Sequence, residues 1–347
     1  MIKEKYIQIT NRMLAIISEI EEFKASWKLL DKIQAEKLYG LKKIATIESI
    51  ASSNRIEGNK LSDDEVEALL SNIKKQSFAS RDEQEVMGYA KLMDTIFEDW
   101  EVIPLSENYI KQLHKILLQF STKDEKHKGE YKKVSNAVAA YSTDGKELDI
   151  VFQTATPFET PYKMEELVNW TRKNLNDNFF HPLIVIGIFV VEFLAIHPFQ
   201  DGNGRLSRAL TCLLLLKAGY GYIPYSSMES IIEENKESYY RALRKTQTTL
   251  SKDSVDYEPW LDFFLKTMQK QKQRLEYKIN TFSKTEFSEL EEKIISYFEN
   301  NNKATIAKIV DYTKANRNTV KKALSALINK NSIILHSKGR GAWYSMR

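Results

Sequence analysis

The sequence has few of the features that stabilise secreted proteins or anchor membrane proteins. Its 347 residues include a single cysteine, Cys212, which excludes a disulfide framework and favours a reducing compartment. The two longest apolar runs, 183–196 and 206–216, are shorter than the roughly 20 residues that cross a bilayer. The first residues also lack the apolar core of a signal peptide. We therefore expect a cytoplasmic protein that does not contact membranes.

Proline and glycine are also scarce, and neither sign of charge is in large excess. Seven prolines and twelve glycines in a chain of this length favour long helices over a turn-rich β architecture. The net charge of +4 does not by itself indicate a nucleic-acid-binding protein. The hydrophobic and charged fractions, 42% and 28%, are those of a soluble globular protein, and the length predicts two or three domains.

Apolar residues at three- and four-residue spacing, typical of amphipathic helices, occupy most of the chain and predict a mainly α fold. One helix is expected from about 41 to 57, where Gly58 ends it, and another from about 228 to 248. The pattern predicts four regions: an N-terminal helical region (1–103), a helical core (104–268), a helical linker (269–286) and a small C-terminal domain (287–347).

The helical pattern is interrupted between Gly129 and Pro161. Residues 134–141 and 148–152 are typical of two short strands, and the Asp-Gly pair between them is typical of a β-hairpin turn. A hairpin that only decorates a helical domain and a hairpin with a binding role both fit this pattern.

One short stretch between the two apolar runs concentrates residues that can perform chemistry. His197 can act as a base near neutral pH, and Asp201 is a hard oxygen ligand suited to Mg²⁺. Residues 202–204 are Gly-Asn-Gly, which lets backbone amides converge at the start of the next helix and bind an anion. Arg205 and Arg208, three residues apart, can bind phosphate oxygens together. This combination predicts a phosphoryl-transfer site.

The stretch reads H-P-F-Q-D-G-N-G-R-L-S-R and resembles the signature of the Fic (filamentation induced by cAMP) family, H-P-F-x-[D/E]-G-N-G-R-x-x-R, at every fixed position. The resemblance implies a helical core and the transfer of AMP from Mg-ATP to a hydroxyl group of a protein. It implies these roles: His197 as the base, Asp201 as the Mg²⁺ ligand, Gly202, Asn203 and Gly204 as the anion hole, and Arg205 and Arg208 as ligands of the phosphate tail.

A second motif lies upstream, where Ser53 and Glu57 are followed by Gly58. Positions i and i+4 share one helix face. The spacing resembles the inhibitory motif of many Fic proteins, [S/T]-x-x-x-E-[G/N], in which the glutamate pairs with the second arginine of the signature, here Arg208. Alone, the pattern fits a capped surface helix. Beside the full signature, it predicts an N-terminal inhibitory helix whose carboxylate neutralises the arginine meant for the γ-phosphate.

The resemblance also assigns the surroundings of the signature. It implies that the hairpin acts as a flap, at about Val151–Pro157, which aligns a target segment by strand addition. Tyr239, Tyr240 and Gln247 fall where family members often line the adenine pocket, although surface or packing roles fit them equally well. The arginine that is common in the family is replaced by Lys132 in the sequence G-E-Y-K, which keeps the charge but loses the fork.

The C-terminal domain is expected to contain three helices, near 290–298, 305–312 and 316–330, and then two strands within 333–344. This order is that of a winged helix-turn-helix domain. Its third helix could enter a DNA groove while the turn between the strands reaches phosphate. The basic residues available for this are Arg317, Lys321, Lys322, Lys338 and Arg340. A winged helix used for protein contacts or dimerisation is the alternative.

Two functional hypotheses of different classes follow. The first is a protein adenylyltransferase that modifies a Tyr, Thr or Ser hydroxyl of a target protein or of itself, and that Glu57 holds inactive. The second is a DNA-binding transcriptional regulator, contacting DNA through 305–344, whose Fic-like core senses nucleotide. Removal of AMP by a water that Glu57 orients stays open as a variant of the first hypothesis. Transfer of another nucleotide also stays open, because the phosphate site does not select adenine. A homodimer would fit the apolar face of the first helix.

Overall fold

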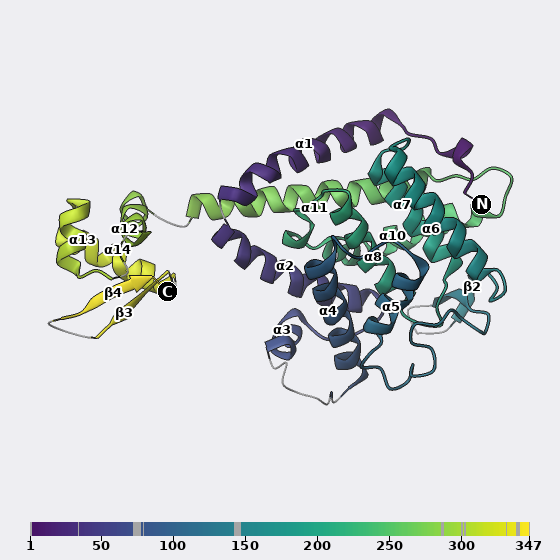
Figure 1. Ribbon diagram of the computed structural model, residues 1–347, viewed down its shortest axis with the longest axis horizontal. Coiled ribbons are helices and arrows are strands. Elements are labelled where there is room, and N and C mark those ends of the chain that lie inside the picture. The colour runs from purple at the N-terminus through teal and green to yellow at the C-terminus, as the bar shows by residue number, and fades with distance from the viewer. Residues whose placement is uncertain are drawn as a thin grey trace. The chain divides into compact units, whose positions relative to one another are not determined.

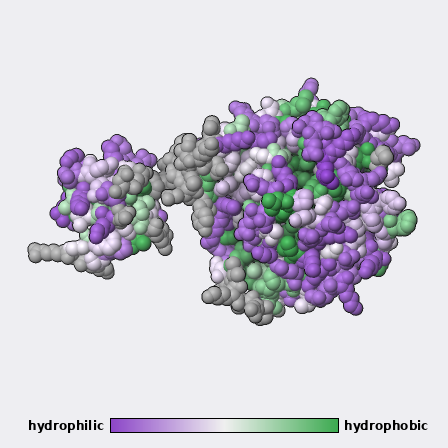
Figure 2. Space-filling model, viewed as in Figure 1, coloured by the Kyte–Doolittle hydropathy of each residue, from purple (hydrophilic) through white to green (hydrophobic). Residues whose placement is uncertain are grey.

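The computed structural model describes residues 2–33, 35–71, 78, 80–141, 147–285, 288–299, 301, 303–330, 332–337 and 341–346. These fall into two compact units, residues 1–275 and residues 276–347 (Figure 1). Both units are predominantly helical, which confirms the prediction of a mainly α protein. No helix in the described ranges is both long and apolar enough to cross a lipid bilayer. Hydrophilic side chains cover most of the face of residues 1–275 that Figure 2 shows, with smaller hydrophobic patches between them.

Helices build the first unit, and several begin at caps that the sequence supplies. Ser80 and Ser106, for example, each accept a backbone N–H from the first turn of the helix that follows. The described α-helices are α1 (Asn11–Ile33), α2 (Ala35–Ile56), α3 (Asp63–Ser71), α4 (Arg81–Asp99), α5 (Glu107–Leu117), α6 (Thr160–Asp177), α7 (Pro182–Ile196), α8 (Asn203–Lys217), α9 (Met228–Glu234), α10 (Lys236–Leu250) and α11 (Glu258–Thr285). Short 3-10 helices occur at Glu4–Tyr6 and Ile223–Tyr225.

Two apolar helices, α7 and α8, pack against each other in the core of the first unit. Every residue of α7 except Pro182 and Glu192 is buried, and in α8 only Gly204 and Lys217 are not. Each large apolar side chain removed from water in this way contributes about 1.5–3 kcal/mol to stability. The signature sequence connects these two helices, so deeply buried elements hold both of its ends.

The predicted helix that ends before Gly58 is the second half of α2, which begins earlier, at Ala35, and ends at Ile56. Gly58 follows with a φ of 97°, a backbone conformation that favours glycine and ends the helix there. Arg55 forms a two-pronged ion pair with Glu233 of α9, with Nε–Oε1 and NH2–Oε2 distances of 2.7 and 2.9 Å. The C-terminal half of α2 is therefore held firmly against α9.

The prediction of one helix over 228–248 is wrong. The chain forms two helices there, α9 and α10, and Asn235 separates them with φ −117° and ψ 29°. The side-chain Nδ2 of Asn235 donates to the carbonyl of Ile231 at 2.7 Å. Asparagine competes in this way for backbone groups of the preceding turn. The break is invisible in the apolar spacing because that spacing continues through both helices.

The two predicted strands are present as β1 (Ala137–Tyr141) and β2 (Glu147–Gln153), which pair in antiparallel fashion with Ala137 opposite Gln153. The Asp-Gly turn expected between them lies outside the described residues. After β2, Thr154–Pro157 leads within a few residues into α6.

The described part of the second unit combines α12 (Glu289–Glu299), α13 (Ile306–Thr313) and α14 (Arg317–Asn329) with the antiparallel strands β3 (Ile333–His336) and β4 (Trp343–Met346). The predicted helices and strands agree with these bounds to within a few residues. The unit has a core of its own, formed by Ile294, Phe298, Ala304, Ile309, Val320, Ala323, Leu324, Leu327 and Ile333. Lys338 and Arg340, expected at the turn between the strands, lie outside the described residues.

Candidate active site

His197 lies at the C-terminal end of α7 and begins the loop that leads to α8. Its backbone is left-handed, with φ 51° and ψ 61°, and its N–H donates to the carbonyl of Phe193 at 2.9 Å. The imidazole Nδ1 lies 3.4 Å from the carbonyl of Leu194, to which it can only donate. Nδ1 therefore carries the proton, and Nε2 keeps the lone pair of a base. Burial lowers the pKa of His197 to about 4, so the ring is neutral at pH 7.

The rest of the loop is held by its own backbone and by α5. The side chain of Asn203 accepts the N–H of Phe199 at 2.9 Å and donates to the carbonyl of Phe199 at 2.8 Å. Phe199 is fully buried and stacks on His114 of α5, with ring centroids 3.8 Å apart. His114 accepts the N–H of Gly129 at Nδ1 and donates from Nε2 to the carbonyl of Asp201, both at 3.0 Å. The loop is thus a fixed turn with a defined orientation at each end.

The first turn of α8 combines free amides with two arginines. Gly202 precedes the helix with a φ of 79°, and a glycine N-cap supplies no side-chain acceptor, so the N–H groups at this end are available to an anion. Arg205 and Arg208 are each only 3% exposed. Nε and NH1 of Arg205 and NH1 of Arg208 are buried without a hydrogen-bond partner in the described structure. Phosphate oxygens would satisfy these guanidinium donors.

The structure brings Glu57 and Arg208 together. NH2 of Arg208 donates to Oε1 of Glu57 at 2.8 Å, while its Nε and NH2 donate to the hydroxyl and carbonyl of Ser53 at 2.9 and 2.8 Å. Burial raises the pKa of the Glu57 carboxyl, but Arg208 outweighs this effect, so the pKa lies below its usual value. A Cβ placed on Gly204 would lie 2.1 Å from Oε1 of Glu57. Glu57 therefore fills the space beside the first turn of α8.

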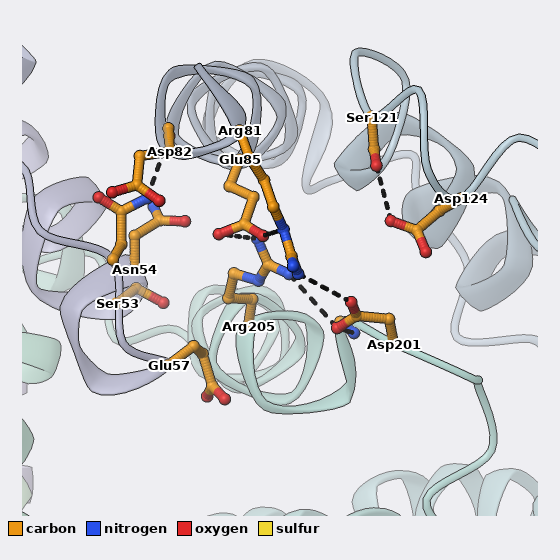
Figure 3. A network of polar contacts seen from close by, with 12 residues as sticks. Ser53, Asn54, Glu57, Arg81, Asp82, Glu85, Ser121, Asp124, Asp201 and Arg205 are labelled. Atoms are coloured by element: carbon orange, nitrogen blue, oxygen red, sulfur yellow. Dashed lines mark hydrogen bonds and ion pairs between the residues drawn. The ribbon is translucent and has the colours of Figure 1, made fainter. Parts of the chain in front are cut away.

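Asp201 lies in a ring of alternating charges (Figure 3). Its Oδ2 is 3.5 Å from NH2 of Arg81, and its Oδ1 is 3.6 Å from NH2 of Arg205. Glu85 contacts both arginines, Nε of Arg81 at 2.7 Å and NH1 of Arg205 at 3.5 Å. Neither Arg81 nor Glu85 was expected from the sequence. The available signal was their i,i+4 spacing on α4 directly after the N-cap Ser80.

Asp201 is suited to be the single carboxylate ligand of an Mg²⁺ ion. Its side chain is 33% exposed, so solvent and substrate can reach it, and its Oδ1 accepts the N–H of Gly202 at 2.5 Å, which fixes the direction of the carboxylate. Within the described residues, no group of three or more His, Cys, Asp or Glu side chains could hold a metal ion. Mg²⁺ commonly takes one or two protein carboxylates and completes its shell with water and phosphate. The donor set therefore fits a metal that arrives with a nucleotide.

A cavity of about 770 Å³ lies beside the hairpin, between the segment after β2, α6, the end of α7 and α10. Gln247, expected in the nucleotide pocket, lines this cavity. Tyr239 does not, because its ring is buried against Tyr240 and Trp260. Tyr239 instead lines a cavity of about 10 Å³ together with Arg208. The structure thus separates Gln247 from Tyr239.

Residues 104–215, which contain this loop, α7 and most of α8, match the Fic/DOC family. The chain therefore carries a Fic/DOC domain. A protein named as a probable protein adenylyltransferase of Aquifex aeolicus (strain VF5) is 31% identical over 96 residues, 28% of this chain and 27% of that protein. The protein adenylyltransferase Fic of Drosophila mojavensis is 31% identical over 88 residues, 25% of this chain and 16% of that protein. The chain thus spans less than a third of the length of these curated relatives.

Solved structures extend the likeness in fold beyond this domain. A Fic family protein from Desulfovibrio desulfuricans G20 matches with a TM-score of 0.64, over 99% of this chain and 98% of that chain, at 22% identity. A Fic domain containing signaling protein from Bacteroides thetaiotaomicron VPI-5482 matches with a TM-score of 0.61, over 74% of this chain and 94% of that chain, at 26% identity. The Fic/DOC domain therefore belongs to a larger helical fold that these proteins share.

Proposed function

We propose that this protein is a protein adenylyltransferase that transfers AMP from Mg-ATP to a Tyr, Thr or Ser hydroxyl and that Glu57 holds inactive. The observation that carries the proposal is the convergence at one loop of His197, the free N-terminus of α8 and the partly unpartnered guanidiniums of Arg205 and Arg208. The Fic/DOC domain and the adenylyltransferase names of its relatives support the same reaction class.

In this reaction the target hydroxyl attacks the α-phosphorus of ATP. His197 takes the hydroxyl proton at Nε2 while the new oxygen–phosphorus bond forms and the bond to pyrophosphate breaks. The amides at the start of α8 receive the α-phosphate oxygens, and Arg205 and Arg208 hold the departing pyrophosphate. Asp201 would hold Mg²⁺, which neutralises phosphate charge when bound. The negative charge of bound phosphate raises the pKa of His197 from its low value and makes the ring a stronger base.

Glu57 would oppose this reaction by occupying the phosphate end of the site. Its carboxylate pairs with Arg208 and lies against Gly204, so a phosphate there would meet a negative charge at close range. ATP could then bind only in a pose that leaves Arg208 unused.

The hairpin is the proposed place for the target segment. In the described residues β1 and β2 form a two-stranded sheet, which leaves one edge of β2 without a strand partner. An extended target segment can add to such an edge by main-chain hydrogen bonds. Thr154 and Thr156, which follow β2, also border the cavity that Gln247 lines.

Incubation of the purified protein with Mg²⁺ and ATP labelled at the α-phosphate tests the proposal. Glu57→Gly should raise self-labelling by about tenfold or more, because Glu57 no longer competes with the phosphate of ATP for Arg208. A factor of ten corresponds to about 1.4 kcal/mol. His197→Ala in the Glu57→Gly background should lower labelling by about 10²–10⁴-fold. Glu22→Gly, which removes an exposed carboxylate from α1, is the matched control and should change nothing.

The adenylyltransferase assignment fails if labelling is unaffected by both changes. ATP labelled at the γ-phosphate should transfer no label, because pyrophosphate leaves. Release of AMP from a labelled protein by the parent chain, lost in Glu57→Gly, would identify AMP removal instead.

The distribution of charge favours a second function, and we propose that the second unit binds duplex DNA through α14. Residues 276–347 hold 13 of the 51 basic and 7 of the 47 acidic residues, a net charge of +6, which leaves −2 for residues 1–275. α14 contributes exposed Arg317, Lys321 and Lys322 and no acidic residue. Positive charge is thus concentrated in one small unit whose elements follow the order of a helix-turn-helix domain.

The salt dependence of binding to a fluorescein-labelled duplex of mixed sequence tests this second proposal. Between about 50 and 200 mM salt, each lost phosphate contact should reduce the slope of log K against log salt by about 0.9. The double variant Arg317→Ala, Lys321→Ala on α14 should reduce the slope by about 1.8, which is about 0.9 for each of two lost phosphate contacts. Lys293→Ala with Lys308→Ala, on α12 and α13, is the charge-matched control. Equal reductions in both pairs, or no binding, would contradict a specific role for α14.

A further inference from the structure

Lys132 is a buried cation at the base of the hairpin. It is 3% exposed, and its ammonium donates three hydrogen bonds: to Oδ1 of Asn136 at 2.8 Å, to Oγ1 of Thr154 at 2.8 Å and to the carbonyl of Ile196 at 2.9 Å. All three acceptors are uncharged. Lysine is almost never fully buried without an acidic partner, so this position calls for a specific reason.

The three acceptors belong to three different segments of the chain. Asn136 directly precedes β1, Thr154 directly follows β2, and Ile196 is the last residue of α7. The backbone N–H of Lys132 also donates to the carbonyl of Pro198 at 2.8 Å. One residue therefore bonds both ends of the hairpin and the residues on either side of His197.

The acceptors also bond to one another and to the loop. The hydroxyl of Thr154 donates to the carbonyl of Asn136 at 2.7 Å, and Nδ2 of Asn136 donates to the carbonyl of Phe199 at 3.0 Å. The carbonyl of Ile196 is one of the last in α7, where helical partners are missing and a cation is favoured. Among the described residues, the ammonium of Lys132 is thus the one cation bonded at the centre of this small network.

We propose that Lys132 is a positioning residue whose ammonium clamps both ends of the β1–β2 hairpin to the peptide units that flank His197. The clamp would set the place of the hairpin and the place of the imidazole together. Its catalytic consequence rests on the proposed transfer reaction, whereas the clamp itself does not. Three acceptors need three N–H groups, and a neutral amine has only two and would turn its lone pair toward an oxygen.

The clamp should therefore depend on pH. Burial, with a smaller effect from Lys163 of α6, lowers the pKa of Lys132 to about 8. Within the part of the chain that the structure describes, the other charged group that faces it is Glu159, the N-cap residue of α6, while His197 stays neutral above its pKa of about 4. As the pH rises through 8, Lys132 loses a proton and the network loses at least one hydrogen bond.

The free energy of unfolding should not fall for this reason in the same window. The folded pKa of about 8 lies below the ordinary 10.5 of an unfolded chain, so the unfolded state binds more protons between these values. The contribution of Lys132 to the free energy of unfolding therefore rises with pH from 8 to 10.5. A loss of labelling above pH 8 without a loss of stability is the expected signature.

Hydrogen exchange and self-labelling in the Glu57→Gly background test the clamp. Lys132→Met should speed amide exchange in β1 and β2 by about tenfold, the effect of losing about 1.4 kcal/mol of local stability, and should lower labelling by a similar factor. Lys133→Met is the matched control, because Lys133 is the next residue and is exposed. It should leave both measurements unchanged.

The pH profile gives an independent readout. Labelling by Glu57→Gly should fall about tenfold per pH unit above 8, and Lys132→Arg, whose guanidinium stays charged, should remove that fall. Equal exchange in Lys132→Met and Lys133→Met, or an unchanged alkaline fall in Lys132→Arg, would overturn the proposal. If Glu57→Gly shows no labelling at all, the transfer reaction is refuted, and the exchange experiment still decides the clamp.

Discussion

Two histidines that must stay neutral support the signature loop. His114 is fully buried and His197 is partly buried, and burial lowers the pKa of each to about 4. His114 uses one ring nitrogen as an acceptor for the N–H of Gly129 and the other as a donor to the carbonyl of Asp201. A second proton on His114 would turn the acceptor into a donor that faces another donor. The shape of the loop therefore depends on the same protonation state that its base chemistry needs.

The free energy of unfolding should fall when the pH is lowered from 7 to 5. The pKa of His114 is about 4 in the folded protein and 6.5 in its ordinary state, so the unfolded chain binds more protons throughout this window. Stability from this group is fully present above pH 6.5 and is lost as the pH falls toward 4. His114 alone should account for about 2 kcal/mol of the loss.

Urea unfolding at the two pH values measures this loss. His114→Leu lowers the stability at both, and the informative quantity is the difference between them, which should shrink by about 2 kcal/mol. An undiminished difference in His114→Leu would show that this histidine does not titrate as its burial implies.

The sequence identified the loop residues because their chemistry is contiguous. His197, Asp201 and the two arginines fall within twelve positions, and residue type alone indicates what each can do. Lys132 and Arg81 reach the loop from 64 and 120 residues upstream. The side chain of Arg81 fits a solvated helix face equally well until the fold brings it to the site. The resemblance marked Lys132 only as the replacement of a common arginine, and its contacts with the loop required the structure.

The contact between α4 and α5 fixes the elements that hold the loop. Gly88 of α4 is buried, and a Cβ there would lie 2.0 Å from the carbonyl oxygen of Leu117 at the end of α5. α4 carries Arg81 and Glu85, and α5 carries His114. The absence of a side chain at Gly88 thus sets the distance between two helices whose side chains both contact Asp201 of the loop.

Gly88→Ala should destabilise the first unit by about 1–3 kcal/mol, because the methyl group can be accommodated only if a backbone moves. Gly40→Ala is the matched control, a helical glycine of α2 with nothing within 4 Å of an added Cβ. That change should stabilise the unit by up to about 1 kcal/mol through helix propensity. Thermal unfolding of both variants gives the comparison, and equal midpoints would contradict the close approach of α4 and α5.

Periodic apolar spacing predicted where helices exist better than it predicted how they meet. Helices α7, α8 and α14 fall close to the ranges expected for them. Gly88 fits the same periodic pattern without revealing that another backbone touches it, and Asn235 breaks a helix by local hydrogen bonding. The backbone contact at Gly88 and the helix break at Asn235 involve backbone and polar atoms, so the spacing of apolar residues does not predict either of them.

On the scale of the whole molecule, the two units differ in both core and charge. In the described part of the second unit, the buried core residues lie within 294–333, with Leu290 and Tyr344 packed against them, and the net charge of the unit is opposite in sign to that of residues 1–275. α11 continues through residue 275, so the chain passes from one unit to the other within a helix rather than through a Gly- and Pro-rich linker. The predicted helical linker, 269–286, falls almost entirely within α11.

Separate cores imply that the units unfold separately. Leu324 lies in the core of the second unit and is 1% exposed. Its replacement by alanine should lower the free energy of unfolding of that unit by about 2–5 kcal/mol. Hydrogen exchange in Leu324→Ala should then speed up in α12, α13 and α14 and stay unchanged in α7 and α8. Leu213→Ala, an equally buried leucine of α8, should give the reverse pattern.

The same pair of variants connects stability to activity. If the proposed transfer reaction belongs to the first unit, Leu324→Ala in the Glu57→Gly background keeps its self-labelling at a temperature at which α14 has lost its protection, and Leu213→Ala loses it. Equal loss of protection in α8 and α14 in either variant would mean that the two cores unfold as one. A mutation in the DNA-binding face proposed for α14 would then be expected to disturb the nucleotide site through stability alone.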